Sequence, residues 1–73
     1  MAVLDATGLV CPLPVLKARK LLKAMEVGEV LEVTATDPAA ALDFAAFCGA
    51  SGHQLIEQND SEGRLYFKIR KSA

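Results

Sequence analysis

Hydrophobic and polar residues alternate in residues 30–36 and 64–70, and this period of two predicts half-buried β-strands. Residues 2–6 are apolar and precede a Thr-Gly pair, which predicts another strand. Residues 53–59 show a weaker strand pattern, and residues 60–63 (Asp-Ser-Glu-Gly) predict a turn before the last strand. The residues expected to face the core from the two alternating strands are Leu31, Val33, Ala35, Leu65, Phe67 and Ile69.

Two further segments have the spacing of amphipathic helices. Cys11-Pro12-Leu13-Pro14 opens the first, which runs to about residue 25; prolines fit a first turn because its N–H groups have no partner within the helix. The second is predicted from Asp37 as N-cap and Pro38 as first helical residue to about residue 48, with Gly49 ending it. The faces expected to be buried are Val15, Ala18, Leu21, Leu22 and Met25 in the first helix and Ala41, Phe44, Ala45 and Cys48 in the second.

The predicted order of elements is β-α-β-α-β-β. Short β-α-β units favour parallel neighbouring strands, and the final hairpin adds an antiparallel pair. Strands with one apolar face need a covering layer, which the two helices supply. We therefore predict one α/β (α+β) domain over residues 1–73. It is a two-layer sandwich of a mixed four-stranded sheet with two helices on one face, and its strand order stays open.

Length and composition narrow the class of protein. A chain of 73 residues has room for one domain and little room for a deep, multi-part active site. Hydrophobic residues make up 52%, which argues against disorder, yet no apolar run approaches the length of a membrane span. The first residues show no secretory signal. These features argue against a Rossmann enzyme, a membrane protein and a disulfide scaffold, and predict a cytoplasmic protein with reduced cysteines.

The net charge of −1 conceals a segregation along the chain. Residues 11–25 hold four basic residues and no acidic one, residues 26–62 hold eight acidic residues and no Lys or Arg, and residues 64–71 hold four basic residues. One interpretation is that these are solvated faces of separate elements. The other is a basic patch around Cys11, which would favour a thiolate or an acidic partner.

Cys11 is the strongest candidate for chemistry. It is expected at a helix N-terminus, where aligned peptide dipoles lower the pKa of a thiol and so make it a better nucleophile. The alternative, a small buried hydrophobe, does not suit a loop-to-helix junction. Leu13 and Leu16 fall among the lysines rather than on the apolar face, which predicts a contact surface unless a tilted helix start half-buries them.

The other candidates carry weaker signals. We predict a structural role for Cys48 on an apolar helix face; a disulfide with Cys11 is the rival, although parallel helices would place the two at opposite ends. His53 is predicted to be an exposed residue at a strand start, with a Cys-His pair as the alternative. These three residues lack metal-ligand spacing, so we predict no metal site. A single tyrosine, Tyr66, near basic residues makes nucleic-acid binding a weak alternative.

One motif connects the chain to a known family. The stretch Leu4-Asp5-Ala6-Thr7-Gly8-Leu9-Val10-Cys11-Pro12-Leu13-Pro14, the basic helix after it, Thr36-Asp37-Pro38 and the basic strand over residues 66–71 resemble the TusA (SirA-like) sulfur-carrier proteins. The resemblance covers nearly the whole chain and implies the same β-α-β-α-β-β sandwich. It also implies sulfurtransferase activity, with a transient persulfide on Cys11, Pro12 and Pro14 as its supporting motif, and no bound cofactor.

The resemblance further implies partners. The donor would be a cysteine desulfurase or a rhodanese-like protein, and the acceptor a cysteine of a DsrE-type relay protein. Known routes lead to tRNA thiolation, molybdenum cofactor synthesis or sulfur oxidation. Some members carry an acidic residue at the position of Leu13 and a basic residue at that of Val10, so the pathway stays open.

Such a carrier needs one exposed thiol of low pKa, a docking surface and no general base of its own. We expect Leu13, Leu16, Lys17 and Lys20 to form the docking rim. We also expect a monomer when free, with neither a membrane nor a nucleic acid as a direct partner. Two other classes stay open: a non-catalytic protein- or RNA-interaction module of the same fold, and a dithiol redox protein that uses Cys48.

Overall fold

The computed structural model describes residues 2–72, so the two end residues of the predicted domain lie outside the described residues. The elements follow the predicted order. They are β1 (Ala2–Ala6), α1 (Leu13–Ala24), β2 (Val30–Ala35), α2 (Ala40–Ser51), β3 (Gln54–Ser61) and β4 (Arg64–Arg70). Neither helix in this part of the chain is long and apolar enough to cross a membrane.

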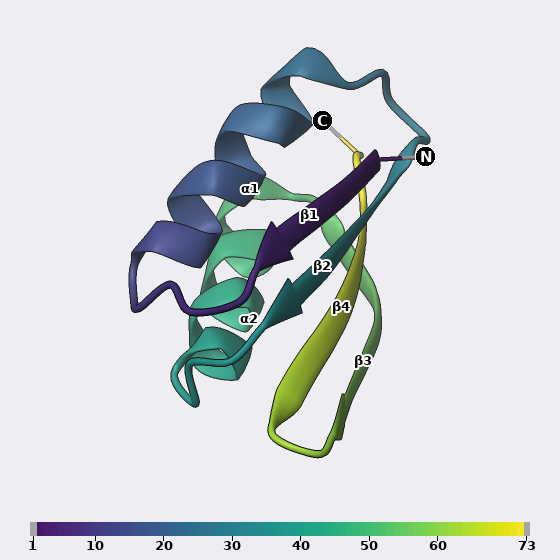
Figure 1. Ribbon diagram of the computed structural model, residues 1–73. Helices are drawn as coiled ribbons and strands as arrows, with labels where there is room; N and C mark the ends of the chain where they lie inside the picture. The colour runs from purple at the N-terminus through teal and green to yellow at the C-terminus, as the bar shows by residue number, and fades with distance from the viewer. Residues whose placement is uncertain (1, 73) are drawn as a thin grey trace.

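The four strands form one mixed sheet in the order β1-β2-β4-β3. β1 and β2 are parallel, whereas β4 pairs antiparallel with β2 on one side and with β3 on the other. The predicted parallel pair and terminal hairpin are therefore confirmed. Because β1 and β2 are parallel, their carboxyl ends lie at the same end of the molecule, and the two strand-to-helix loops lie there together (Figure 1).

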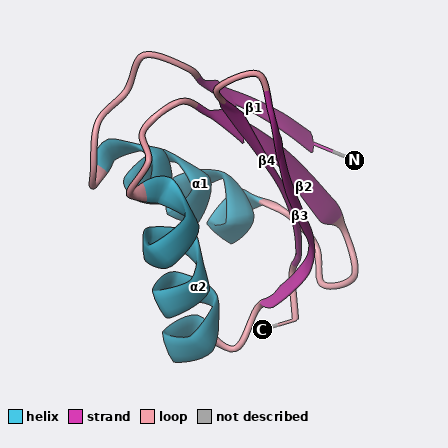
Figure 2. Cartoon of the chain, turned by 90° about the horizontal axis from the view of Figure 1, so that it is seen from below, coloured by secondary structure: helices cyan, strands magenta, loops and turns pink. Residues whose placement is uncertain are grey.

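Both helices cover one face of the sheet and leave the other face open (Figure 2). Five of the six predicted inward-facing residues of β2 and β4 are fully buried, and the sixth, Leu65, is partly buried against the core. Phe44 of α2 packs on Phe67 of β4 with ring centroids 4.7 Å apart, an aromatic contact that joins the two layers. The predicted two-layer sandwich is confirmed. The core consists of Ala6, Ala18, Leu22, Leu31, Val33, Ala35, Ala40, Phe44, Cys48, Phe67 and Ile69.

The first helix buries the predicted face and one residue more. Ala18 and Leu22 are buried, and Val15, Leu21 and Met25 are partly buried against the core. Pro14 is also buried, because α1 turns it toward the sheet. Its role is therefore packing as well as starting the helix.

The bounds of the second helix differ from the prediction. The carboxylate of Asp37 does accept a hydrogen bond from a backbone amide, that of Ala39 at 3.0 Å, but Pro38 and Ala39 form a turn and the helix begins at Ala40. Gly49 lies inside the helix, which ends at Gly52 with a positive φ of 84°. The shifted start buries Ala40 and leaves Ala45, predicted to be buried, exposed.

The turn between the last two strands is tighter than predicted. Ser61 already pairs with Arg64, so the loop consists of Glu62 and Gly63 alone. Both have a positive φ, 52° and 79°, as a two-residue type I′ hairpin requires. Glycine adopts such a conformation readily, whereas Glu62 does so against its side-chain preference.

Candidate functional site

Cys11 lies in the exposed loop between β1 and α1. The loop turns directly after the strand, where the Asp5 Oδ1 atom accepts hydrogen bonds from the amide and the hydroxyl of Thr7 at 3.0 and 2.7 Å. Gly8, with a φ of 80°, continues the turn. The peptide bond between Cys11 and Pro12 is cis. The predicted placement of the thiol at an open loop-to-helix junction is confirmed.

Two hydrogen bonds attach this loop to the neighbouring loop between β2 and α2. The amide of Gly8 donates to Thr36 Oγ1 at 2.9 Å, and the amide of Cys11 donates to Asp37 Oδ2 at 2.5 Å. Asp37 therefore serves two loops, because its other oxygen accepts from Ala39. The hydrogen bonds that Asp37 accepts from the amides of Ala39 and Cys11 hold the pKa of its carboxyl below its usual value.

The electrostatic prediction for the thiol is wrong in sign. The pKa of Cys11 is raised, first by a hydrogen bond from the thiol to the Asp43 carboxylate, then by partial loss of hydration and by the negative charges of Asp43 and Asp37. The charged groups that shift this pKa are therefore carboxylates of the second loop and helix, and the predicted basic patch does not surround the sulfur.

The prolines explain why the N-terminus of α1 does not offset the effect of these carboxylates on the pKa of Cys11. Pro12 is the N-cap of α1 and Pro14 the second helical residue, and neither has an amide hydrogen. The amide of Leu13 already donates to the carbonyl of Val10 at 2.9 Å. Since the positive end of a helix resides in its free first-turn N–H groups, this start has little with which to stabilise a thiolate.

The residues predicted to form the docking rim are all on the surface. Leu13 and Leu16 keep 43% and 50% of their surface exposed, which does not separate a contact surface from the half-buried alternative, and Lys17 and Lys20 are exposed on the same helix. The docking role itself stays a prediction. Sequence reasoning missed Asp43, which gives no signal beyond being the only charged residue of residues 40–51.

Cys48 and His53 lie at the other end of the helix layer. Cys48 is 6% exposed near the end of α2, and its burial raises the pKa of its thiol, in line with the predicted structural role. Both cysteines are free. His53 follows α2, partly buried rather than exposed, and its Nδ1 accepts a hydrogen bond from the Ser72 amide at 3.2 Å. The topology therefore brings neither residue to Cys11.

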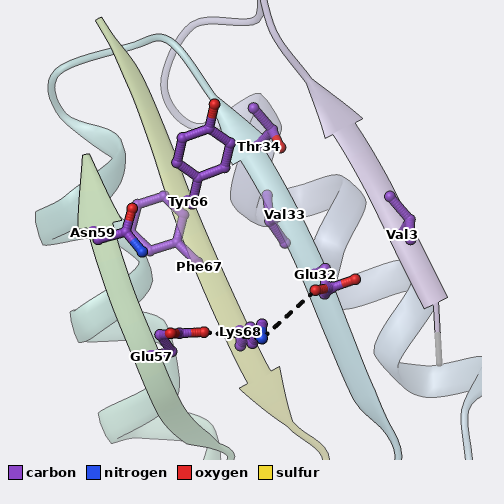
Figure 3. A pocket seen from close by; sticks show the side chains of 9 residues that line it. All are labelled: Val3, Glu32, Val33, Thr34, Glu57, Asn59, Tyr66, Phe67 and Lys68. Atoms are coloured by element: carbon purple, nitrogen blue, oxygen red, sulfur yellow. Dashed lines mark ion pairs between the residues drawn. The ribbon is translucent and has the colours of Figure 1, made fainter. Parts of the chain in front are cut away.

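The open face of the sheet carries a shallow hollow of about 310 Å³ that Cys11 does not line (Figure 3). Lys68 points out of it between two carboxylates, with Nζ 3.0 Å from Glu57 and 3.8 Å from Glu32. The pair with Glu57 is the main reason why the pKa of Lys68 is raised. The lysine therefore lies in an ion-pair network rather than on an open cationic surface, which disfavours a nucleic-acid platform beside Tyr66.

The fold and the site together define a class: small two-layer α+β proteins that present one exposed thiol at the start of their first helix. A family model described as "Sulfurtransferase TusA" matches residues 2–71, and the chain belongs to this family. The predicted resemblance is thereby confirmed.

Sequence alignments with named relatives extend over nearly the whole chain. The chain is 51% identical over 69 residues to "Sulfur carrier protein TusA" of Allochromatium vinosum, covering 94% of this chain and 91% of that protein. It is 45% identical over 69 residues to "Putative sulfur carrier protein YrkI" of Bacillus subtilis, covering 94% and 92%. The crystal structure of the SirA-like protein from Desulfitobacterium hafniense matches with a TM-score of 0.87 and 28% identity over 100% of both chains.

Proposed function

We propose that this protein is a sulfurtransferase of the carrier type, which holds sulfane sulfur as a persulfide on Cys11. The observation that carries the proposal is the exposed thiol in a loop that two hydrogen bonds hold against the start of α2. Membership of the TusA family and relatives named as sulfur carriers support it. A thiol that must exchange sulfur with other proteins has to protrude, and a defined loop keeps it in one position for them.

The proposed partners are a cysteine desulfurase or rhodanese-like donor and a cysteine on a DsrE-type relay protein as acceptor. The proposed setting is the cytoplasm, where thiols are kept reduced. The cycle needs no group besides the transient persulfide, so we propose neither a resident cofactor nor a metal. Because Cys48 is buried and remote, sulfur would leave Cys11 for another protein rather than for a second thiol of the same chain.

We propose that partners dock on the N-terminal half of α1. Leu13 and Leu16 supply exposed apolar surface next to the thiol, and Lys17 and Lys20 supply positive charge beside it. Apolar residues flanked by charges suit a transient interface, in which burial gives affinity and charge gives orientation. One such surface is enough for a monomer that meets donor and acceptor in turn.

The test is the mass of the intact protein after incubation with a cysteine desulfurase and cysteine. The expected result is an adduct of a single sulfur atom that Cys11→Ala abolishes and the matched variant Cys48→Ala retains. Absence of the adduct in the wild type, or its survival in Cys11→Ala, would contradict the proposal. In that case the fold would serve as a non-catalytic interaction module, and Cys11→Ser would leave partner binding unchanged.

A further inference from the structure

The carboxylate of Asp37 bonds two loops at once. Its Oδ2 atom accepts a hydrogen bond from the amide of Cys11 at 2.5 Å, and its Oδ1 atom accepts one from the amide of Ala39 at 3.0 Å. A hydrogen bond to a carboxylate is shorter and stronger than one between neutral groups. The residue that carries the thiol is therefore bonded directly to a residue 26 positions further along the chain.

Asp37 is held in place on its own side of this contact. Its carbonyl accepts a hydrogen bond from the amide of Ala40 at 3.0 Å, in addition to the bond that its side chain accepts from Ala39. Pro38 follows directly and disfavours a helical backbone at Asp37. The turn before α2 thus orients the carboxylate, and the amide of Cys11 meets an acceptor whose position is already defined.

The loop that carries the thiol has fewer attachments near the sulfur. Leu9 packs partly against the core and so attaches the first half of the loop, whereas residues 10–12 are exposed. Pro12 has no amide hydrogen, so the amide of Cys11 is the backbone donor beside the sulfur. Its bond to Asp37 is therefore the contact that fixes the exposed end of this loop.

We propose that Asp37 is a positioning residue for sulfur transfer: by holding the amide of Cys11, it keeps the exposed sulfur in one place beside the docking residues of α1. The inference rests on the proposed sulfur-carrier function and deepens it. Loading converts Cys11–SH and a donor R–S–SH into Cys11–S–SH and R–SH, so atoms and electrons balance without an oxidant. Asp37 forms and breaks no covalent bond in this exchange.

A fixed position matters because two proteins must bring three sulfur atoms roughly into line. The attacking sulfur has to approach along the S–S bond that breaks, and a misplacement of about 1 Å can cost on the order of 100-fold in rate. A loop that sampled several positions would meet the sulfur of a docked partner in only a fraction of its conformations. A small thiol reagent has no such requirement, because it approaches from any open side.

The same carboxylate opposes the ionisation of the thiol. Asp43 and partial loss of hydration raise the pKa of Cys11, and the negative charge of Asp37 raises it further. Removal of Asp37 should therefore increase the fraction of thiolate while it releases the loop. Transfer between proteins and reaction with a small reagent should respond in opposite directions, so one variant can separate position from charge.

The experiment measures sulfur uptake from a cysteine desulfurase, and alkylation by iodoacetamide at pH 7, in Asp37→Ala. In uptake, kcat should fall at least about tenfold, whereas KM for the carrier should stay within about twofold because the docking residues of α1 are unchanged. Alkylation should become faster. Hydrogen exchange followed by NMR should be faster at the Cys11 amide and unchanged at the amides of β2. Asp37→Asn keeps an oxygen acceptor without the charge and should retain more of kcat than Asp37→Ala.

A second pair of variants tests position without a change of charge. Thr36 Oγ1 accepts a hydrogen bond from the amide of Gly8 at 2.9 Å and so holds the same loop. Thr36→Val removes this acceptor and should lower kcat by a smaller factor than Asp37→Ala, with alkylation within about twofold of the wild type. Thr36→Ser keeps the hydroxyl and should restore kcat. Asp60→Asn, on β3 and in neither loop, should change neither reaction.

The outcomes decide between position and charge. If Asp37→Ala takes up sulfur with the wild-type kcat, or if its uptake speeds up together with alkylation, Asp37 is only an electrostatic neighbour and the inference is overturned. Should Asp37→Ala fail to fold, the Thr36 pair decides, and a wild-type kcat in Thr36→Val overturns the inference. If the wild type itself takes up no sulfur, the proposed function fails, so the two failures are distinguishable.

Discussion

At the scale of single residues, the exposure of the Cys11 thiol and its reactivity have separate causes. Cys11 protrudes because Pro12 and Pro14 start a helix directly after it, a local property of the motif. Its ionisation depends on Asp37 and Asp43, which lie far along the chain and raise its pKa. A carrier role therefore cannot rely on a permanently ionised thiol. It needs removal of the proton during transfer.

The pH dependence of alkylation tests this electrostatic arrangement. Because the pKa of Cys11 is raised, little thiolate is present at pH 7, and the rate with iodoacetamide should rise through a midpoint above the usual thiol value of about 8.5. In Asp37→Asn the midpoint should move to lower pH, by less than in Asp43→Asn, since Asp37 bonds the amide rather than the sulfur. Mass spectrometry of the digested protein distinguishes alkylation of Cys11 from alkylation of Cys48. A wild-type midpoint below the usual value would contradict the assignment.

At the scale of elements, the parts of the chain that local patterns describe best are α1 and the alternating strands. Their bounds follow from periodicity and from prolines, which act within a few residues. The start of α2 deviates because Asp37 bonds both its own turn and the Cys11 loop. Gly49 did not end that helix, since a glycine inside a helix costs only about 1 kcal/mol, which packing of α2 on the sheet offsets.

The β3–β4 hairpin contains a residue whose replacement should stabilise the protein. Glu62 adopts a φ of 52°, which Asn tolerates better, and Asn-Gly is the favoured pair for a two-residue type I′ loop. We expect Glu62→Asn to stabilise the protein by about 0.5–1 kcal/mol, measured by urea unfolding. Asp60→Asn on the neighbouring strand removes the same charge and should leave stability within about 0.5 kcal/mol. A loss of stability in Glu62→Asn would show that the turn conformation is misassigned.

At the scale of the whole molecule, the two layers hold the site in place. The contact between Phe44 and Phe67 joins α2 to the centre of the sheet, one turn of helix beyond Ala40 and next in sequence to Asp43. The position of that carboxylate relative to the thiol therefore depends on the packing of the core. In a chain of 73 residues the core is small, so a substitution that leaves one large cavity removes much of the stability of the fold.

Truncation of the central aromatic contact tests this dependence. Phe44 is fully buried, and Phe44→Ala should cost about 3–5 kcal/mol, a large part of the stability of a small domain. Leu42→Ala lies on the same helix but 79% exposed, and should stay within about 0.5 kcal/mol of the wild type. Guanidinium unfolding gives both values. Equal effects of the two substitutions would mean that α2 does not pack as described.

Taken by itself, the sequence determined the order of elements, the two layers, the inward residues of β2 and β4, and the exposed cysteine. These follow from spacing and from turn residues, which act between neighbours along the chain. Only the tertiary structure decided that β4 lies between β2 and β3, and that Asp37 and Asp43 meet the Cys11 loop. Parallel pairing of β1 with β2 brings two distant loops to one end, and no local pattern encodes which charges face each other there.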